Sequence, residues 1–101
     1  MIIAEVHVAP VGTGETSMGA VVAETVKAAQ RRGIKYEVNP MGTTLEAGDL
    51  EQLLDVVREM HETVFKQGAQ RVLTFVHIDD RRDKELTMRY KVESVQAKVG
   101  Q

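Results

Sequence analysis

The first part of the chain alternates between two faces and then changes to a helical repeat. Over residues 2–9 one face is wholly apolar and the other mixes apolar and polar side chains, which predicts a strand. Residues 10–14 interrupt this pattern, and Thr16 or Ser17 is positioned to cap a following helix. Apolar residues then recur at helical spacing, and Gly33 is typical of the position just beyond a helix end.

Two further strand-like runs flank a turn signal. Residues 34–38 and 44–46 read as strands on either side of residues 39–43, where a proline fixes φ and a glycine accepts positive φ. We therefore expect a hairpin over residues 34–47. Met41 is unusual within it, because turn tips are mostly small and polar, so two interpretations stay open. The segment is either a plain connection or one wall of a pocket.

The second half of the chain predicts a helix, a strand and a last helix. Asp49 and Gln52 form a capping-box pattern at the start of a helix that Gly68 ends. Residues 71–79 then carry apolar side chains on both faces of a strand, and Asp83 is the candidate cap of the final helix. The apolar stripe of that helix consists of Met88, Val92, Val95 and Val99.

This order of elements predicts the α+β class, as a ferredoxin-like βαββαβ sandwich with an extra C-terminal helix. We expect one domain over residues 1–101, with an antiparallel four-stranded sheet and the first strand in its centre. Helices cover only one face of such a sheet, yet Leu73 and Phe75 point to the other face. The apolar open face implies a second layer, which is the C-terminal helix, another subunit or both. We expect a homo-oligomer.

Composition narrows the possible functions. Of the 101 residues 43% are hydrophobic and 28% charged, and a formal net charge of −2 gives no general attraction to nucleic acid or anionic membranes. The absence of cysteine excludes disulfides, thiol catalysis and thiolate metal sites. Neither an apolar run of membrane-spanning length nor a signal-peptide pattern is present. We expect a cytoplasmic protein without nucleic-acid or membrane partners.

Polar residues on the predicted open face raise the question of a metal site. Glu5, His7 and His77 share this face and are residue types that ligate metals. Pairing the first and last strands about their centres puts Glu5 beside Phe75 and His77 beside Ile3, roughly 13 Å from His7. We therefore expect no metal.

Catalytic signals are also weak. The glycine-containing loop at residues 11–17 resembles a phosphate cradle only faintly, because it lacks a lysine of the Walker type and carries Glu15. Ser17 and Ser94 are the only serines, and neither has a partner histidine and acid in a recognisable motif. We expect no enzymatic activity and no cofactor.

Seven stretches of the chain together form a recognisable pattern: Glu5–Gly12, Ser17, Tyr36–Thr43, Glu46, Arg71-Val72, Ile78–Lys84 and Lys91–Val95. This pattern, which spans essentially the whole chain, resembles the small thiamine-binding protein family. The resemblance implies a ferredoxin-like subunit assembled into dimers or tetramers. It also implies binding of thiamine or its hydroxymethylpyrimidine moiety without catalysis, by a carrier, sequestering or uptake-assisting protein. The alternative is an oligomeric structural or regulatory interaction module that has no small-molecule ligand.

The chemistry of such a ligand suggests which residues bind it. A carboxylate suits the aminopyrimidine edge or the thiazolium cation, amide and hydroxyl groups suit the amino group or the hydroxyl, and a methionine sulfur suits a flat ring. The expected ligand-binding residues are Glu5, Val11, Ser17, Asn39, Met41, Gly42, Thr43 and Glu46. Asp79–Arg82 falls at the opposite edge of the sheet, where it contacts either ligand or a neighbouring subunit.

Overall fold

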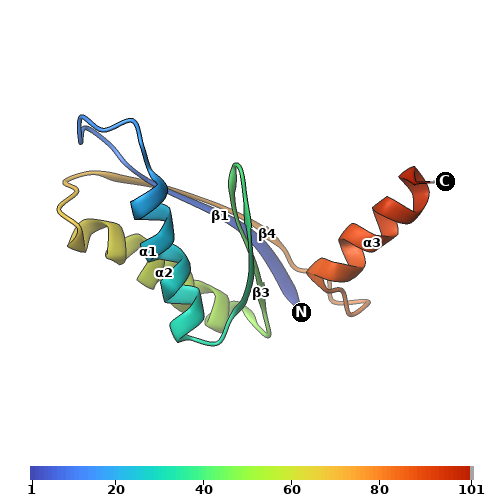
Figure 1. Cartoon of the computed structure of the whole chain (residues 1–101). Helices are drawn as coiled ribbons and strands as arrows, with labels where there is room; N and C mark the ends of the chain where they lie inside the picture. The colour runs from blue at the N-terminus through green and yellow to red at the C-terminus, as the bar shows by residue number, and fades with distance from the viewer. Residues whose placement is uncertain (101) are drawn as a thin grey trace.

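The structure is a computed structural model that describes residues 1–100 (Figure 1). Strands and helices follow one another in the order expected from the sequence. They are β1 (Ile2–Pro10), α1 (Gly19–Arg31), β2 (Lys35–Asn39), β3 (Gly42–Ala47), α2 (Leu50–Lys66), β4 (Val72–Asp79) and α3 (Met88–Val99).

The four strands form one antiparallel sheet in the order β2-β3-β1-β4. β1 therefore lies in the interior of the sheet between β3 and β4, and the ferredoxin-like prediction is confirmed. Figure 1 shows α1 and α2 together on one side of the sheet, which we call the helix face. The other side is called the open face, and its outward-pointing residues include Glu5, His7, Glu37, Thr44, Glu46, Leu73, Phe75 and His77.

The register between β1 and β4 differs from the sequence-based prediction by two residues. Glu5 lies opposite His77, whereas pairing about the strand centres predicted Phe75. The true pairing continues to the end of β1, where the Val11 N–H donates to the Arg71 carbonyl at 2.8 Å. The pairing runs from Ile3 opposite Asp79 to Pro10 opposite Val72, which makes Glu5 and His77 cross-strand neighbours on the open face.

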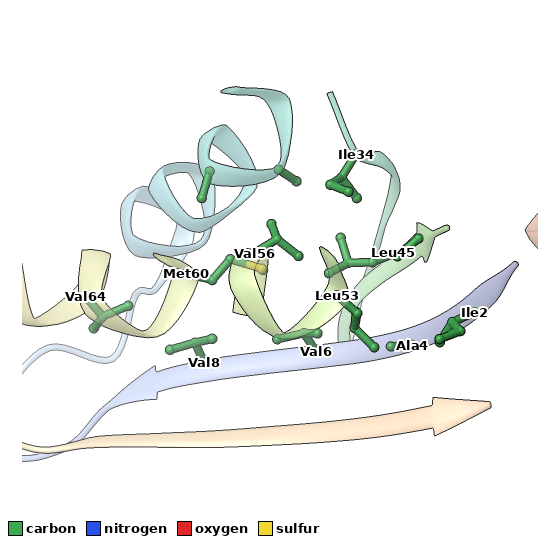
Figure 2. Close-up of a cluster of buried hydrophobic side chains, with 13 residues drawn as sticks. Ile2, Ala4, Val6, Val8, Ile34, Leu45, Leu53, Val56, Met60 and Val64 are labelled. Carbon is green, nitrogen blue, oxygen red and sulfur yellow. The ribbon is translucent and has the colours of Figure 1, made fainter. Parts of the chain in front are cut away.

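The core lies between the helix face and α2. The alternating apolar residues of β1 point toward the helices, as their period of two requires. Figure 2 shows side chains of α2 resting on them, and α1 approaches closely through Ala28 and Ala29. Fully buried members include Val6, Leu45, Leu53, Val56, Met60 and Val64.

Most helix ends follow the signals in the sequence. Gly33 has φ +67°, and the Gly33 and Ile34 N–H groups donate to the carbonyls of Gln30 and Ala29, which is the Schellman arrangement. Asp49 caps α2 by accepting the Gln52 N–H at 2.8 Å. The Gln52 side chain in turn accepts the N–H of Gly48 at 2.7 Å.

Two predicted caps are wrong. Neither Thr16 nor Ser17 caps α1, since the N-cap residue is Met18 and no side chain accepts a hydrogen bond there. At α3, the cap is Thr87, which accepts the Tyr90 N–H at 3.0 Å. Asp83 is instead paired with Arg81, four residues before the cap, because the loop after β4 is longer than the pattern of charges suggested.

The C-terminal helix does not cover the open face of its own chain. Figure 1 shows α3 extending away from the sandwich at the end where β4 finishes. Met88 is the buried residue of this helix, and Leu86, two residues before it, is buried as well. The second layer expected over this face is therefore not supplied by α3 of the same chain, because Leu73 and Phe75 stay exposed. Within residues 1–100, no helix is both long and apolar enough to cross a membrane.

Candidate functional site

A cavity of about 680 Å³ lies between α1 and the hairpin formed by β2 and β3, and we call it the hairpin cavity. It opens where the hairpin ends while β1 continues. β3 pairs with β1 only as far as Val6, whereas β4 follows β1 on to Pro10. Past Val6, the edge of β1 that faces the hairpin therefore leaves its strand partner and borders the cavity instead. Main-chain groups at such an edge are available to a ligand.

The walls of the hairpin cavity are largely apolar. Its floor comes from the core, and its two sides come from α1 and from the hairpin tip. Met41 stands at the tip with 80% of its surface exposed, so its side chain is free to fold toward a ligand. An apolar cleft with a few polar groups at fixed positions is the usual form of a small-molecule site. The residues that line the cavity include Val6, His7, Val8, Val26, Met41 and Thr43.

The structure brings four of the predicted ligand-binding residues to this cavity, namely Asn39, Met41, Gly42 and Thr43. Thr43 is buried on the helix face beside Val6. The Asn39 amide donates to the Thr44 hydroxyl at 2.8 Å, so its nitrogen is already engaged within the hairpin on the open-face side. Its role in binding a ligand stays a prediction.

Gly42 is required for a different reason than the one predicted. Its φ is not among the positive values of the chain, so it does not serve as a left-handed turn residue. A Cβ at this position would instead lie 3.1 Å from Glu5 Cγ and 3.2 Å from the Val6 carbonyl oxygen. The absence of a side chain lets the end of the hairpin approach β1 closely.

Gly42→Ala is expected to lower the free energy of unfolding by about 1–3 kcal/mol, because β1 and the hairpin must separate to admit the methyl group. Urea denaturation measures the change. Gly48→Ala serves as the control, because its new Cβ would lie 3.4 Å from the flexible Gln52 side chain, an ordinary contact. Equal stability of wild type and Gly42→Ala would contradict the close-approach explanation.

Val11 and Ser17 border a different space. They line a cavity of about 760 Å³, here called the loop cavity, between residues 10–18 and the connection from α2 to β4. Met18 lines both cavities, which places them on either side of the start of α1. Val11 and Ser17 were expected to bind the same ligand as the hairpin residues, but the N-terminal turn of α1 separates them from the hairpin cavity.

Glu5 and Glu46 are absent from the lining of the hairpin cavity, because both belong to the open face. Glu5 is exposed between Thr44 and His77 on the neighbouring strands. Glu46 is only 6% exposed, and its carboxylate accepts the Met88 N–H at 2.7 Å. The buried glutamate therefore anchors the start of α3.

Glu46→Ala is expected to lower the free energy of unfolding by about 1–3 kcal/mol, because the buried Met88 N–H loses its acceptor. Glu46→Gln retains an oxygen at the same place and should lose much less. Chemical denaturation gives the stability, and hydrogen exchange of the Met88 amide reports the local effect. Unchanged exchange in Glu46→Ala would contradict the anchoring role.

The predicted separation of His7 and His77 rests on a register that the protein does not have. His77 lies beside Glu5, and the ring of His7 lies 6.2 Å from that of Phe75 on the adjacent rung. Even so, residues 1–100 contain no group of three or more histidine, aspartate or glutamate side chains arranged to hold a metal ion.

The Asp79–Lys84 cluster lies at the opposite end of the sheet from the hairpin tip, as predicted. From Asp80 onward the cluster borders a cavity of about 510 Å³, which Met1 and Gly48 also line. Arg82 pairs with Asp80, and its hydrogen bond holds the pKa of that carboxyl below its usual range. Arg81 lowers the pKa of Asp83 in the same way. The four charges neutralise one another in pairs, and none of them reaches the hairpin cavity.

Sequence reasoning missed several residues of the hairpin cavity. Val26, Lys27 and Gln30 of α1 line it, and Met60 contributes from α2. The helical period identified the apolar positions of α1, but it could not separate those that face the core from those that face a cleft. His7 was assigned to the open face, yet it also borders the cavity where β1 passes the hairpin. The edge of β1 becomes visible only once the strand register is known.

Comparisons with known proteins agree with the sequence resemblance. A family described as thiamine-binding protein matches residues 4–96. The chain is 46% identical to a UPF0045 protein of Methanothermobacter thermautotrophicus, over 98% of this chain and 100% of that one. It is 44% identical to the UPF0045 protein YqgV of Bacillus subtilis, over 94% of both chains.

Solved structures show the same fold. A hypothetical protein of Methanocaldococcus jannaschii superposes with a TM-score of 0.84 at 36% identity, covering 93% of this chain and 94% of that one. A Thermotoga maritima protein, described as a candidate for thiamine biosynthesis or salvage, gives a TM-score of 0.76 at 26% identity. That match covers 93% of this chain and 97% of the other.

Proposed function

Because the chain belongs to the thiamine-binding protein family, we propose that it binds thiamine or its hydroxymethylpyrimidine moiety in the hairpin cavity, without catalysing a reaction. The ligand is cargo rather than a cofactor, and the proposed role is that of a cytoplasmic carrier, sequestering or uptake-assisting protein. Self-association into a dimer or tetramer is part of the proposal, since Leu73 and Phe75 leave an apolar open face.

One observation carries this proposal: a stretch of the family resemblance, Asn39–Thr43, coincides with a wall of the largely apolar hairpin cavity. Asn39–Thr43 was singled out from sequence alone, and these residues line the cavity in the folded chain. Its volume of about 680 Å³ falls within the usual range for small-molecule sites. A motif and a cavity were thus identified by separate routes and meet at one place.

The chemistry of the cavity suits an aminopyrimidine ring. Val26 and Met41 stand on opposite sides, so a flat ring between them contacts aliphatic carbon on one face and a polarizable sulfur on the other. An aminopyrimidine carries hydrogen-bond donors and acceptors along one edge. The hairpin pairing ends at Val6, so the edge of β1 at His7 and Val8 offers main-chain donors and acceptors that can pair with this edge of the ring. The Thr43 hydroxyl supplies a further group that both donates and accepts.

Glu5 and Glu46 play no part in this binding mode, because they lie on the open face. No carboxylate lines the hairpin cavity within the described chain, and Lys27 at its rim is paired with Glu24 at 2.9 Å. The pyrimidine ring is therefore expected to lie inside and the cationic thiazolium to point toward solvent. Hydroxymethylpyrimidine alone should then retain most of the heat of binding.

Isothermal titration calorimetry with thiamine, hydroxymethylpyrimidine and thiamine phosphate tests the proposal. Binding of the first two without any change in their chemical identity is the expected result. No heat and no thermal shift at millimolar ligand would reject it and favour the interaction module without ligand. Conversion of any of the three compounds, followed by chromatography of the mixture, would show an enzyme instead.

A further inference from the structure

We propose that Lys27 makes the hairpin cavity selective for phosphate monoesters of the proposed ligands, by pairing its ammonium group with the phosphate. The class includes the phosphate esters of thiamine and of hydroxymethylpyrimidine, which share an aminopyrimidine ring and an anionic phosphate. This selectivity rests on the proposed function, because it requires the pyrimidine ring to lie in the cavity. It adds the chemical class of ligand that binds most tightly.

The first supporting feature is the charge of the cavity wall. Lys27 is the one lysine or arginine among the described residues that line the hairpin cavity, and no aspartate or glutamate accompanies it there. His7 borders the cavity through β1, but its ring lies on the open face, 6.2 Å from the ring of Phe75. A charged group of a ligand at the cavity mouth therefore meets a single positive side chain, which favours an anion.

The second feature is the place of Lys27 on α1. The α1 residues on the cavity wall recur at the spacing of one helix face, and they include Ala23, Val26, Lys27 and Gln30. Val26 is half-buried whereas Lys27 is exposed, so Lys27 stands where the apolar wall meets solvent. A lysine at such a boundary packs its aliphatic stem along apolar surface and keeps its ammonium in water. A ring seated beside Val26 therefore directs its outward-pointing substituent toward the ammonium.

The third feature is that the ammonium of Lys27 is free to change partners. It pairs at 2.9 Å with Glu24, which lies one turn earlier on α1, and the two side chains are 55% and 42% exposed. An ion pair between exposed side chains three residues apart contributes little to stability, because water solvates both charges. A phosphate monoester carries about −1.5 to −2 charge at pH 7 and three acceptor oxygens. It is therefore a stronger partner for the ammonium than a single carboxylate.

The fourth feature is a hydrogen bond that joins α1 to the hairpin beside Lys27. The Gln30 amide, three residues after Lys27, donates to the Tyr36 hydroxyl of β2 at 2.7 Å. This bond ties α1 to β2 at the cavity mouth, so the helix that carries Lys27 and the hairpin are held together before a ligand enters. A preformed rim of this kind lowers the cost of ordering the site on binding.

Other cations of the chain are less suited to this role. The two arginines of the Asp79–Lys84 cluster pair with carboxylates of the same cluster, at the opposite end of the sheet from the hairpin tip. Arg71 lines the loop cavity, on the other side of the start of α1. A ligand whose ring occupies the hairpin cavity thus has Lys27 as the cation on its own wall, and Arg71 supplies a matched control on the second cavity.

Calorimetry with thiamine, hydroxymethylpyrimidine and the phosphate monoester of each tests the selectivity. The measured quantity is the ratio of the affinity for an ester to the affinity for its parent compound. For the wild-type chain we expect a ratio of about five at low salt, which decreases at high salt as the ion pair is screened. Lys27→Gln should remove the preference, and Glu24→Gln should increase it, because the ammonium loses its competing partner. Arg71→Gln removes an exposed cation of the loop cavity and should keep the wild-type ratio.

Each other outcome has a distinct meaning. Equal affinities for ester and parent in the wild-type chain would overturn the selectivity and leave the proposed function standing. An undiminished preference in Lys27→Gln would overturn the role of Lys27, and loss of the preference in Arg71→Gln would move the phosphate to the loop cavity. No binding of any of the four compounds would reject the proposed function together with the selectivity. A preference for one ester alone would support the proposal and identify which ligand carries the phosphate.

Discussion

Val26→Phe is expected to lower the affinity for thiamine and hydroxymethylpyrimidine at least tenfold, about 1.4 kcal/mol of binding free energy. Val26 is half-buried on α1 and lines the hairpin cavity, so a phenyl ring there occupies the space proposed for the pyrimidine ring. The cavity is open to solvent on the side of the hairpin tip, which allows the larger side chain to enter without compressing the core. Calorimetry with both ligands measures the loss.

Val21→Phe provides the matched control for this experiment. Val21 is also half-buried on α1, but it lines the loop cavity on the other side of the helix start. Its substitution should leave both affinities within about twofold of wild type, because Val21 does not line the hairpin cavity. The reverse result, with Val21→Phe blocking and Val26→Phe binding normally, would move the ligand site to the loop cavity. That outcome would restore the predicted roles of Val11 and Ser17.

Leu53→Ala is expected to lower the free energy of unfolding by about 3–5 kcal/mol, a large part of the stability of a domain this small. Leu53 is fully buried where α2 meets the sheet, in the centre of the cluster shown in Figure 2. Removing three carbon atoms leaves a cavity between rigid elements, which the backbone of β1 cannot fill by relaxing. Urea denaturation with an unchanged slope measures the loss as a change in midpoint.

Leu54→Ala makes the same chemical change one residue further along α2. Leu54 is 49% exposed, so the loss should stay below about 1 kcal/mol. The difference between the two variants isolates packing from helix propensity, because both replace leucine by alanine in the same helix. Similar losses for Leu53→Ala and Leu54→Ala would mean that Leu54 is covered in solution by another chain.

Features that depend on near neighbours in the chain were predicted well. Gly33 ends α1 because a left-handed residue is needed one step after a helix, and Asp49 caps α2 because its side chain reaches an N–H three residues on. Both are contacts within six residues. The prediction that Thr16 or Ser17 caps α1 was wrong for a local reason as well. The helix begins at Gly19, beyond both residues, so Met18 is its N-cap.

Features that depend on distant pairing were predicted less well. A shift of two residues in the register keeps every side chain on its predicted face, so the alternation of β1 contains no signal against it. The shift nevertheless brings His77 beside Glu5. Glu46 illustrates the same limit, because its partner is the Met88 backbone, forty-two residues away. The alternation of polar and apolar residues in a strand contains no signal that a charged residue such as Glu46 will be buried.

For the candidate site, the sequence by itself determined the residue types of the hairpin and its position between two strands. These follow from periods of two and 3.6 residues and from turn chemistry, which act over a few residues. Only the tertiary structure decided that Asn39–Thr43 borders a cavity with α1, that Val11 and Ser17 border another, and that α3 leaves Leu73 and Phe75 exposed on the open face. The physical reason is that a side chain's neighbours across a cleft are set by the packing of whole elements, to which residues throughout the chain contribute.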